Sequence, residues 1–426
     1  MRREPLASGP AMADVRPLRA VHYDLASAGP LADVVAPPYD VIDARQRAEL
    51  VARSPYNVVE IDLPDGDEPY AHAAELYAEW QRAGVLVRDS GPALWPLEQR
   101  YRGPDGELRT RRGFFARVRV EEYGAGRIRP HERTHPGPKE DRLRLTRATR
   151  ANLSPIFSLY SDADGSAWNA LSGAAAGAPW GEVTDGDGTV HRLWRCGDPA
   201  AIEVVQTTLA DAELLIADGH HRYETARVYA EEIGGEGDHR YVLMCLVALE
   251  DPGLTIFPTH RLVRGLDAAR RDALAEAIER DFVATTVARD QIAPIAGAGP
   301  LELGYADAQQ TLHLRLRDQS IADAALAELP SAYRRLDTGV LEALLLKGAL
   351  GLTDEDISHL HGFGYARDAA QALELVDNGE YDAAFVLRPT PVEEVREVAA
   401  AGVNMPPKST YFFPKVLTGL VINPLA

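Results

Sequence analysis

The sequence contains little cysteine. Its 426 residues include only Cys196 and Cys245, which are 49 positions apart and belong to no CxxC pair. Neither a disulfide framework nor a zinc cage is therefore indicated. The simplest interpretation is that both are buried and act as small apolar side chains.

Positive charge is also scarce. Lys and Arg total 45 against 64 Asp and Glu, which gives a net charge of −19. Binding to nucleic acid or anionic lipid depends on Lys and Arg neutralising phosphates, so neither partner is predicted. Only four of the basic residues are lysines, and three of them, Lys139, Lys408 and Lys415, lie in motif-rich stretches. We hypothesise that lysine persists where a planar guanidinium cannot replace a compact ammonium.

Long apolar runs are absent as well. The longest, YVLMCLVAL at 241–249, has half the length that a membrane helix needs and is predicted to be a buried strand. Residues 1–15 carry charge without an apolar segment, which predicts a flexible leader and no secretory signal. These absences favour a soluble, acidic, cytoplasmic protein with no membrane partner. They leave a homo-oligomer open.

Helical and strand patterns alternate along the chain, which predicts an α+β (mixed α/β) fold. We expect a core at 16–263, with a surface insertion near 162–190, and a C-terminal α/β lobe at 264–426. Within the core the predicted elements are strands at 32–36 and 57–64, helices at 43–55 (with Asp43 as N-cap) and 68–84, a hairpin at 93–123, and a strand, loop, helix and strand at 214–249.

The stretch LLIADGHHRYETAR, residues 214–227, places Asp218, Gly219, His220, His221 and Arg222 where a buried strand ends and a helix begins. Such a junction directs free backbone N–H groups and the positive end of the helix dipole at one point, which attracts phosphate. Arg222 adds a bidentate donor, and the histidines add neutral or cationic donors. A carboxylate beside a phosphate indicates a divalent cation or a hydroxyl to orient, so Asp218 is a candidate Mg²⁺ ligand.

A second polar cluster occupies residues 130–142, where prolines and a glycine are expected to prevent a helix before Lys139. Glu132 is a candidate general base, and Lys139 and Arg142 are candidate charge stabilisers. Asp141 is a candidate metal or hydroxyl ligand. The cluster also contains His131, His135 and Glu140.

The third stretch is MPPKSTYFFPKVLTGL at 405–420. Lys408, Ser409 and Thr410 superficially match the end of a Walker A motif, but no GxxxxG precedes them and two prolines occupy the loop, so we reject a P-loop. The stretch could close over a pocket with a polar edge and an aromatic floor. A C-terminal strand that packs on the second lobe is the alternative.

Four segments together resemble the family called domain of unknown function 1015. They are VVAPPYDVI (34–42), HERTHPGPKEDRL (131–143), ADGHHRYETA (217–226) and MPPKSTYFFPK (405–415), and the resemblance runs over residues 16–424. The family name implies no activity.

The DGHHR segment is similar to the signature of the ParB and sulfiredoxin-like superfamily, in which a GxxR turn at a helix start holds nucleotide phosphates. The superfamily includes partition CTPases, sulfiredoxin and an ADP-dependent kinase of free serine. The resemblance implies a nucleotide-binding core, Mg²⁺ and phosphoryl transfer. No motif cysteine corresponds to that of sulfiredoxin, and the acidic charge does not suit a DNA-binding partition protein, which leaves the free serine kinase branch.

These observations predict an enzyme that uses Mg²⁺ and ATP or ADP to phosphorylate a small hydroxyl substrate, with serine or a related hydroxy-amino acid as the best guess. Residues 219–222 would bind the phosphates, and Glu132 would take the hydroxyl proton. The candidate substrate-binding residues are Tyr39, Asp40, His131, Lys408 and Ser409.

Two alternatives remain open at this point. The first is a nucleotide-gated module that hydrolyses slowly and signals by changing shape. The second is a metal-dependent hydrolase with histidine ligands, namely His131, His135, His220 and His221.

Overall fold

A computed structural model describes residues 13–123, 126–131, 136–294 and 301–425. The chain forms two compact units: unit 1 comprises residues up to Thr255 and Pro414–Ala426, and unit 2 comprises Ile256–Phe413. The predicted boundary after residue 263 therefore lies eight residues too late. The predicted lobe at 264–426 is also too long, because its last 13 residues return to unit 1.

Unit 1 is built on a mixed sheet of nine strands. Two neighbouring pairs, β6 with β11 and β8 with β12, are parallel, and the other pairs are antiparallel. In spatial order the strands are β6 (Ile128–Arg129), β11 (Leu214–Asp218), β8 (Ile156–Tyr160), β12 (Tyr241–Ala248), β5 (Leu108–Arg119), β4 (Trp95–Arg102), β10 (Val190–Leu193) and β9 (Gly181–Thr184), with β1 (Val15–Arg16) also paired to β5.

One face of this sheet is covered by three helices, α7 (Ser166–Ala175), α8 (Pro199–Leu209) and α9 (His220–Ile233). Their apolar side chains form one core cluster with alternate residues of the strands, among them Phe114, Ile216 and Met244. The period of two in a strand sends the intervening residues to the opposite face. That opposite face carries polar side chains, including the cross-strand pair of Arg111 and Gln99.

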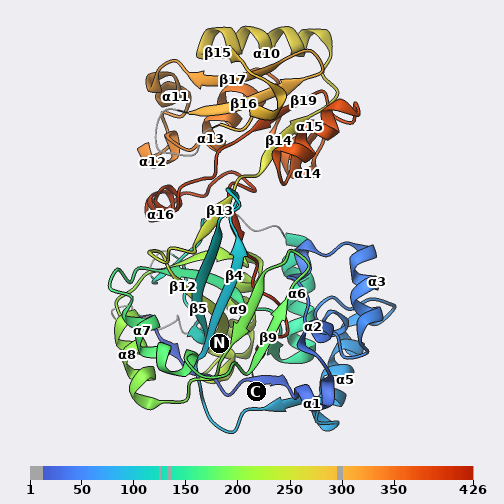
Figure 1. Ribbon diagram of the computed structural model, residues 1–426, viewed down its shortest axis with the longest axis vertical. Helices are drawn as coiled ribbons and strands as arrows, with labels where there is room; N and C mark the ends of the chain where they lie inside the picture. The colour runs from blue at the N-terminus through green and yellow to red at the C-terminus, as the bar shows by residue number, and fades with distance from the viewer. Residues whose placement is uncertain (1–12, 124–125, 132–135, 295–300, 426) are drawn as a thin grey trace. The chain divides into compact units, whose positions relative to one another are not determined.

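The remaining elements of unit 1 are helical segments and two small sheets (Figure 1). Pairs β2 (Val21–Tyr23) with β3 (Leu86–Arg88) and β21 (Asn423–Pro424) with β7 (Ala151–Asn152) are antiparallel. The helices are α1 (Leu25–Ala28), α2 (Leu31–Val34), the 3₁₀ turn η1 (Tyr39–Val41), α3 (Ala44–Arg53), α4 (Val59–Asp62), α5 (Pro69–Arg82), α6 (Pro136–Thr149) and η2 (Asp238–Arg240).

Several predicted elements are confirmed, and others are wrong. The hairpin is β4 with β5, and the strand, loop, helix and strand at 214–249 are β11, α9 and β12. Asp43 caps α3, since its Oδ1 accepts a hydrogen bond of 2.7 Å from Gln46 N. The predicted strands at 32–36 and 57–64 are instead helical, as α2 and α4.

Two further predictions about unit 1 need correction. Helix α6 begins at Pro136, not at Lys139. Proline is tolerated there because the first N–H groups of a helix have no intrahelical partner. The predicted surface insertion at 162–190 contains α7 and β9, so part of it is an edge strand of the main sheet. The predicted leader lies mostly outside the described residues, but its last residue, Val15, begins β1.

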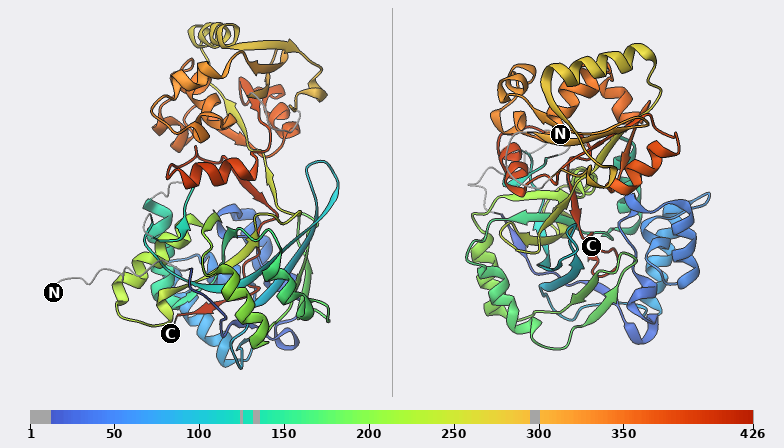
Figure 2. Two further views of the ribbon diagram at one scale, coloured as in Figure 1. Left: turned by 90° about the vertical axis from the view of Figure 1, so that its left-hand side faces the viewer. Right: turned by 45° about the horizontal axis from the view of Figure 1, so that its top comes forward.

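Unit 2 has a six-stranded antiparallel sheet in the order β15 (Phe282–Thr286), β17 (Thr311–Leu316), β16 (Glu302–Asp307), β19 (Ala383–Val386), β14 (His260–Val263) and β18 (Phe363–Ala366). Strands β13 (Thr255–Phe257) and β20 (Tyr411–Phe413) form a separate pair. Helix α10 runs beside the six-stranded sheet of unit 2 in each view (Figures 1 and 2).

The helices of unit 2 supply much of its core, which includes Leu274 of α10 and Leu345 of η4. They are α10 (Ala268–Asp281), η3 (Arg289–Gln291), α11 (Gln319–Ala325), α12 (Ser331–Arg334), α13 (Asp337–Leu341), the π-helical segment η4 (Glu342–Lys347), α14 (Asp354–His359), α15 (Ala369–Asp377) and α16 (Val392–Ala400).

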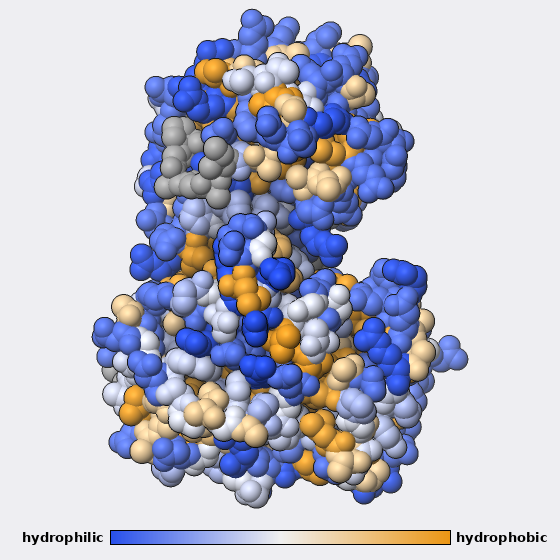
Figure 3. Space-filling view, in the orientation of Figure 1, coloured by the Kyte–Doolittle hydropathy of each residue, from blue (hydrophilic) through white to orange (hydrophobic). Residues whose placement is uncertain are grey.

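Hydrophobic side chains on the face drawn in Figure 3 form small groups among hydrophilic ones. Among the residues that the structure describes, no helix combines the length and the apolarity that crossing a bilayer requires.

Candidate active site

A β-bulge at the end of β11 determines where Asp218 points. Ile216 lies opposite Ser158 of β8, but Asp218 lies opposite Phe157, so the register shifts by one residue between them. Without the shift Asp218 would share the face of Ile216, which packs under the helices. The bulge moves the carboxylate to the opposite face of the sheet, beside Phe157. Bulges that redirect a side chain are frequent next to active sites.

Gly219 links this strand to α9. It has φ +96°, in the left-handed region that favours glycine. It also leaves room for a neighbour, because a Cβ at this position would be 3.0 Å from Cζ and Nε of Arg222. No side-chain hydrogen bond caps α9 within the described residues. The positive end of the helix dipole is therefore not screened by a side-chain cap, which favours an anion there.

Arg222 lies in the first turn of α9 and is only 9% exposed. Its Nη1 donates to the carbonyl of Pro155, and its Nη2 lies 3.2 Å from Oδ2 of Asp218. Nε has no hydrogen-bond partner among the described residues. Burial alone would lower the pKa of Arg222, but the charges of Asp218 and Asp40 raise it, so the guanidinium stays charged.

Lys415 approaches the same carboxylate from the C-terminal segment of unit 1. Its Nζ lies 3.5 Å from Oδ2 of Asp218, the oxygen that Arg222 also contacts. The Lys415 side chain is 17% exposed. Two cations thus share one carboxylate oxygen at the N-terminus of α9.

His131 and His220 contact each other beside the junction of β11 and α9. Their ring centroids are 4.7 Å apart, and the backbone N–H of His131 donates to Nε2 of His220 at 3.3 Å. His131 Nδ1 lies 2.7 Å from the carbonyl of Ile216, at the bulge. Burial, together with the charge of His131, holds the pKa of His220 well below its ordinary value. His220 is therefore a neutral group that supports the start of the 131–142 segment.

Helix α6 contributes Arg142, which is 5% exposed. Its Nε donates to Oδ2 of Asp141 at 2.7 Å, and its guanidinium lies over the ring of Tyr39 at 4.1 Å from the centroid. Asp141 also accepts a hydrogen bond of 2.9 Å from the hydroxyl of Tyr70. Burial raises the pKa of Tyr39 to about 12, so this phenol remains protonated. The cluster joins the predicted residues Tyr39, Asp141 and Arg142.

Sequence reasoning missed Asp62, a carboxylate that is 4% exposed at the end of α4. Its Oδ2 accepts a 2.7 Å hydrogen bond from Ser154, and its Oδ1 lies 3.6 Å from Nη1 of Arg142. Burial raises the pKa of Asp62, while Arg142 and Ser154 oppose the shift. The available signal was an acidic residue at the end of the segment NVVEID, but this segment also fits the pattern of a strand.

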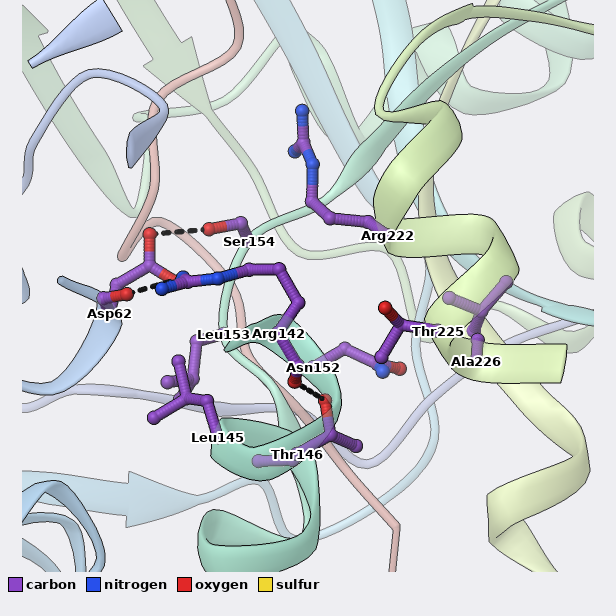
Figure 4. A pocket seen from close by; sticks show the side chains of 12 residues that line it. Asp62, Arg142, Leu145, Thr146, Asn152, Leu153, Ser154, Arg222, Thr225 and Ala226 are labelled. Carbon is purple, nitrogen blue, oxygen red and sulfur yellow. Dashed lines mark hydrogen bonds and ion pairs between the residues drawn. The ribbon is translucent and has the colours of Figure 1, made fainter. Parts of the chain in front are cut away.

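A small cavity of about 40 Å³ lies between the residues around Arg142 and those around Arg222 (Figure 4). Asp62 and Ser154 line one side, Arg142 of α6 the middle, and Arg222 and Thr225 of α9 the other side. A water needs roughly 10–15 Å³ of such space, so the cavity has room for a few waters but not for a nucleotide. A nucleotide would therefore have to bind outside this cavity, with only its phosphates near Arg222.

Other predicted site residues are dispersed. Glu132 and His135 lie outside the described residues. The backbone carbonyl of Lys139 accepts from Thr225 of α9 at 3.4 Å, and His221 is half-buried. Asp40 is exposed, although its charge acts on Arg222.

Lys408 and Ser409 belong to unit 2. Lys408 is exposed and has φ +56°. The Ser409 hydroxyl donates to the carbonyl of Pro406 at 2.6 Å and lies 3.0 Å from the hydroxyl of Thr338. These contacts hold the Ser409 hydroxyl within its own loop. A substrate-binding role for either residue stays a prediction.

The residues around Asp218 fit Mg²⁺ only in part. Within the described ranges, no three His, Cys, Asp or Glu side chains gather as a metal site would require. Mg²⁺ commonly binds through one or two carboxylates together with substrate phosphates, and Asp218 can supply one such carboxylate. Because Arg222 and Lys415 already contact its Oδ2, Asp218 would hold the ion only when the phosphates of a nucleotide provide further oxygens.

Distant solved structures are similar to the chain at low identity. A variant free serine kinase in complex with AMP is 12% identical, with 67% of this chain and 84% of that chain covered and a TM-score of 0.36. SbnI from Staphylococcus aureus, truncated at its C-terminus, is 12% identical over 71% and 85%, with a TM-score of 0.37. A conserved hypothetical protein from Pyrococcus furiosus is 14% identical over 67% and 87%, with a TM-score of 0.34. TM-scores of this size do not establish a shared function.

No curated protein matches the chain. One family model does, over residues 15–339, and its description is "protein of unknown function (DUF1015)". Three of the four motifs that suggested this family, at 34–42, 131–143 and 217–226, lie within the match, whereas the motif at 405–415 lies beyond it. Each of the three supplies residues of the clusters just described, among them Tyr39, Arg142 and Arg222. Because the match covers well over half of the sequence, the chain belongs to the DUF1015 family.

Proposed function

We propose that this protein is a nucleotide-dependent phosphotransferase that phosphorylates a small hydroxyl compound, with serine or a related hydroxy-amino acid as the first candidate. The observation that carries the proposal is the buried guanidinium of Arg222 at the uncapped N-terminus of α9, with its unpartnered Nε against Gly219. Arg222 already pairs with Asp218, but its buried Nε lacks an acceptor, and a buried donor without an acceptor is costly. A phosphate of ATP or ADP supplies the anion that this end of the helix favours.

In this proposal the backbone N–H groups of residues 219–222 and the Arg222 guanidinium hold the transferred phosphates. Asp218 would hold a Mg²⁺ ion, which supplies charge neutralisation on the phosphate oxygens when it is bound. Arg142 and Lys139 would stabilise the charge that develops on the equatorial oxygens. These residues would position the phosphates and neutralise their charge, which is most of what phosphoryl transfer requires.

The acceptor is proposed to bind near Tyr39, Asp40 and His131. Its hydroxyl oxygen attacks the phosphorus, the bond to the bridging oxygen of the nucleotide breaks, and the hydroxyl proton passes to Glu132. Glu132 lies outside the described residues, so this role rests on the sequence. No described contact favours the hydrolase alternative, because His220 is buried and its Nε2 accepts a hydrogen bond.

The test is to incubate the protein with Mg²⁺, with ATP, ADP or CTP in separate reactions, and with hydroxy-amino acids, and to identify products by mass spectrometry. We expect a phosphorylated acceptor. Nucleotide binding with slow hydrolysis and no phosphorylated acceptor would contradict the kinase proposal and favour the nucleotide-gated module.

A variant separates the proposed site from general effects. Arg222→Gln should weaken nucleotide binding by about tenfold or more, because it removes a charge-assisted contact worth roughly 1.5–3 kcal/mol. The matched control is Arg147→Gln on α6, whose exposed ion pair with Glu232 contributes about 0–1 kcal/mol to stability. Titration calorimetry with each nucleotide measures both. Equal affinity of Arg222→Gln and the unaltered protein would exclude the proposed phosphate site.

A further inference from the structure

A second buried arginine, Arg111 in β5, takes no part in the phosphate site proposed above. It is 0% exposed, and burial lowers its pKa to about 10. Its guanidinium lies over the ring of Phe157 at 4.5 Å from the centroid. Within the described ranges its Nη1 has no hydrogen-bond partner, and the carboxylate of Asp251 acts on it through its charge without forming an ion pair. A charge that is buried at this cost without a counter-ion requires another explanation.

The hydrogen bonds of Arg111 connect it to a row of side chains across three neighbouring strands. Gln99 of β4 lies opposite Arg111, and His191 of β10 lies opposite Gln99. Arg111 donates to Oε1 of Gln99, whose Nε2 lies 3.2 Å from Nδ1 of His191, and His191 Nε2 lies 2.8 Å from Oδ2 of Asp185. Arginine can only donate, so Gln99 must turn its Oε1 to Arg111 and its Nε2 to Nδ1 of His191. His191 then carries its proton on Nε2 and donates it to Asp185.

This row holds the backbone of the C-terminal segment. Nη2 of Arg111 donates to the carbonyl of Pro414 at 2.5 Å, and Nε2 of Gln99 donates to the carbonyl of Lys415 at 3.0 Å. Two consecutive carbonyls are thus bound by side chains from adjacent strands. The same residue, Lys415, directs its ammonium to Asp218, 3.5 Å from the oxygen that Arg222 contacts.

We infer that Lys415 is a second phosphate-binding cation of the site, and that Arg111 and Gln99 are positioning residues that hold it there. A simple ion pair with Asp218 would not require two buried side chains to hold its backbone. The residue type agrees with this role, since lysine accounts for only four of 45 basic residues in the sequence. A compact ammonium can contact a phosphate oxygen as a point charge where a planar guanidinium needs more room. The inference rests on the proposed function.

The first experiment measures the binding of ADP and ATP by calorimetry for the unaltered protein and for Lys415→Met, Lys415→Arg and Arg222→Gln. We expect Lys415→Met to raise the Kd about tenfold or more, the loss of one charge-assisted contact. Lys415→Arg should recover only part of this. If Lys415→Met binds like the unaltered protein while Arg222→Gln does not, the role of Lys415 is wrong and the proposed phosphate site stands. If the unaltered protein binds neither nucleotide, both are wrong.

The second experiment tests positioning with a double-mutant cycle. Gln99→Met keeps the volume of the side chain and removes its hydrogen bond to Lys415, and it should raise the Kd severalfold. The same change in the Lys415→Met background should have no further effect, because Gln99 acts through Lys415. The control is Arg100→Gln, the exposed neighbour on β4. An equal loss of affinity in both backgrounds, or no loss in either, would overturn the positioning role.

Discussion

Gly219 meets two requirements at one position. Its φ of +96° is unfavourable for any residue with a Cβ, and a Cβ there would lie 3.0 Å from the Arg222 guanidinium, which is closer than an ordinary contact. Gly234, at the other end of α9, has φ +69°, and a Cβ there would have nothing within 4 Å. Substitution of Gly234 therefore tests backbone strain alone, whereas substitution of Gly219 tests strain together with crowding of Arg222.

We predict that Gly234→Ala lowers the free energy of unfolding by about 1–2 kcal/mol, the cost of a left-handed backbone, and leaves nucleotide affinity unchanged. Gly219→Ala should cost at least as much and should also weaken nucleotide binding, because Arg222 must shift. Urea unfolding followed by tryptophan fluorescence and calorimetry with ADP measure the two effects. Equal nucleotide affinity of the two variants would contradict the crowding argument.

At the residue scale the sequence identified only part of the site. Gly219 and Arg222 were recognisable because they follow a buried strand and open a helix, and Arg142 and Tyr39 lie in motifs with unusual proline spacing. Asp218 was recognisable too, but the bulge that turns it to the second face depends on strand register, which a single sequence does not reveal. Asp62 was missed because its segment, 57–64, has the pattern of a strand, whereas Asp62 ends helix α4.

At the element scale, valine-rich runs explain the two wrong strands. Runs of four to eight apolar residues do not distinguish a strand from a short buried helix. Here the buried side chain of Asn57 decides the conformation: its Nδ2 donates to the carbonyls of Asp33 and Val35, and its Oδ1 accepts from the N–H of Val59. One side chain thus joins the end of α2 to the start of α4. Such tertiary contacts override local propensity.

Strand β14 of unit 2 carries a histidine that makes stability depend on pH. His260 is 3% exposed, and its Nδ1 accepts a hydrogen bond of 3.1 Å from the N–H of Leu387, just after β19. Burial, followed by the charge of Arg261, lowers the pKa of His260 to about 4 from an ordinary value of 6.5. The folded state therefore keeps this imidazole neutral where the unfolded state protonates it.

Between pH 6.5 and about 4 the unfolded state binds the extra proton, so the free energy of unfolding of unit 2 should fall as the pH falls. At about 1.36 kcal/mol per pKa unit, His260 would account for a loss of up to about 3 kcal/mol, and its full contribution is present above pH 6.5. His260→Gln should abolish this dependence. Hydrogen exchange of peptides from 256–413 measures it, with the exposed His359→Gln as control. An unchanged pH profile in His260→Gln would contradict the assignment.

At the scale of the whole molecule, the chain leaves unit 1 after Thr255 and returns to it at Pro414. The returning segment contributes buried side chains to unit 1, among them Leu420, Val421 and Ile422, each 0–1% exposed. It also pairs with residues from the first part of the chain, as Ile422 does with Val21. Alternating patterns in the sequence predicted a second α/β lobe, but not this return, which depends on contacts between residues about 400 positions apart.

We predict that a chain shortened to end at Phe413 loses stability in unit 1 and not in unit 2. All five tryptophans lie between Trp80 and Trp194, so fluorescence reports on unit 1 alone. The urea midpoint measured by fluorescence should decrease, while hydrogen exchange of peptides from 256–413 should remain as in the full chain. A fluorescence midpoint equal to that of the full chain would show that the returning segment contributes little to unit 1.

The return of the chain also sets an order in time. A ribosome that has made Arg222 must add another 193 residues before Lys415 exists. At about 5–20 residues per second this takes roughly 10–40 s. During this interval the nascent chain already carries the strand, bulge and helix start that surround Asp218, but not the ammonium that we infer completes them. Translation that stops within unit 2 would therefore release a product that binds nucleotide with lower affinity.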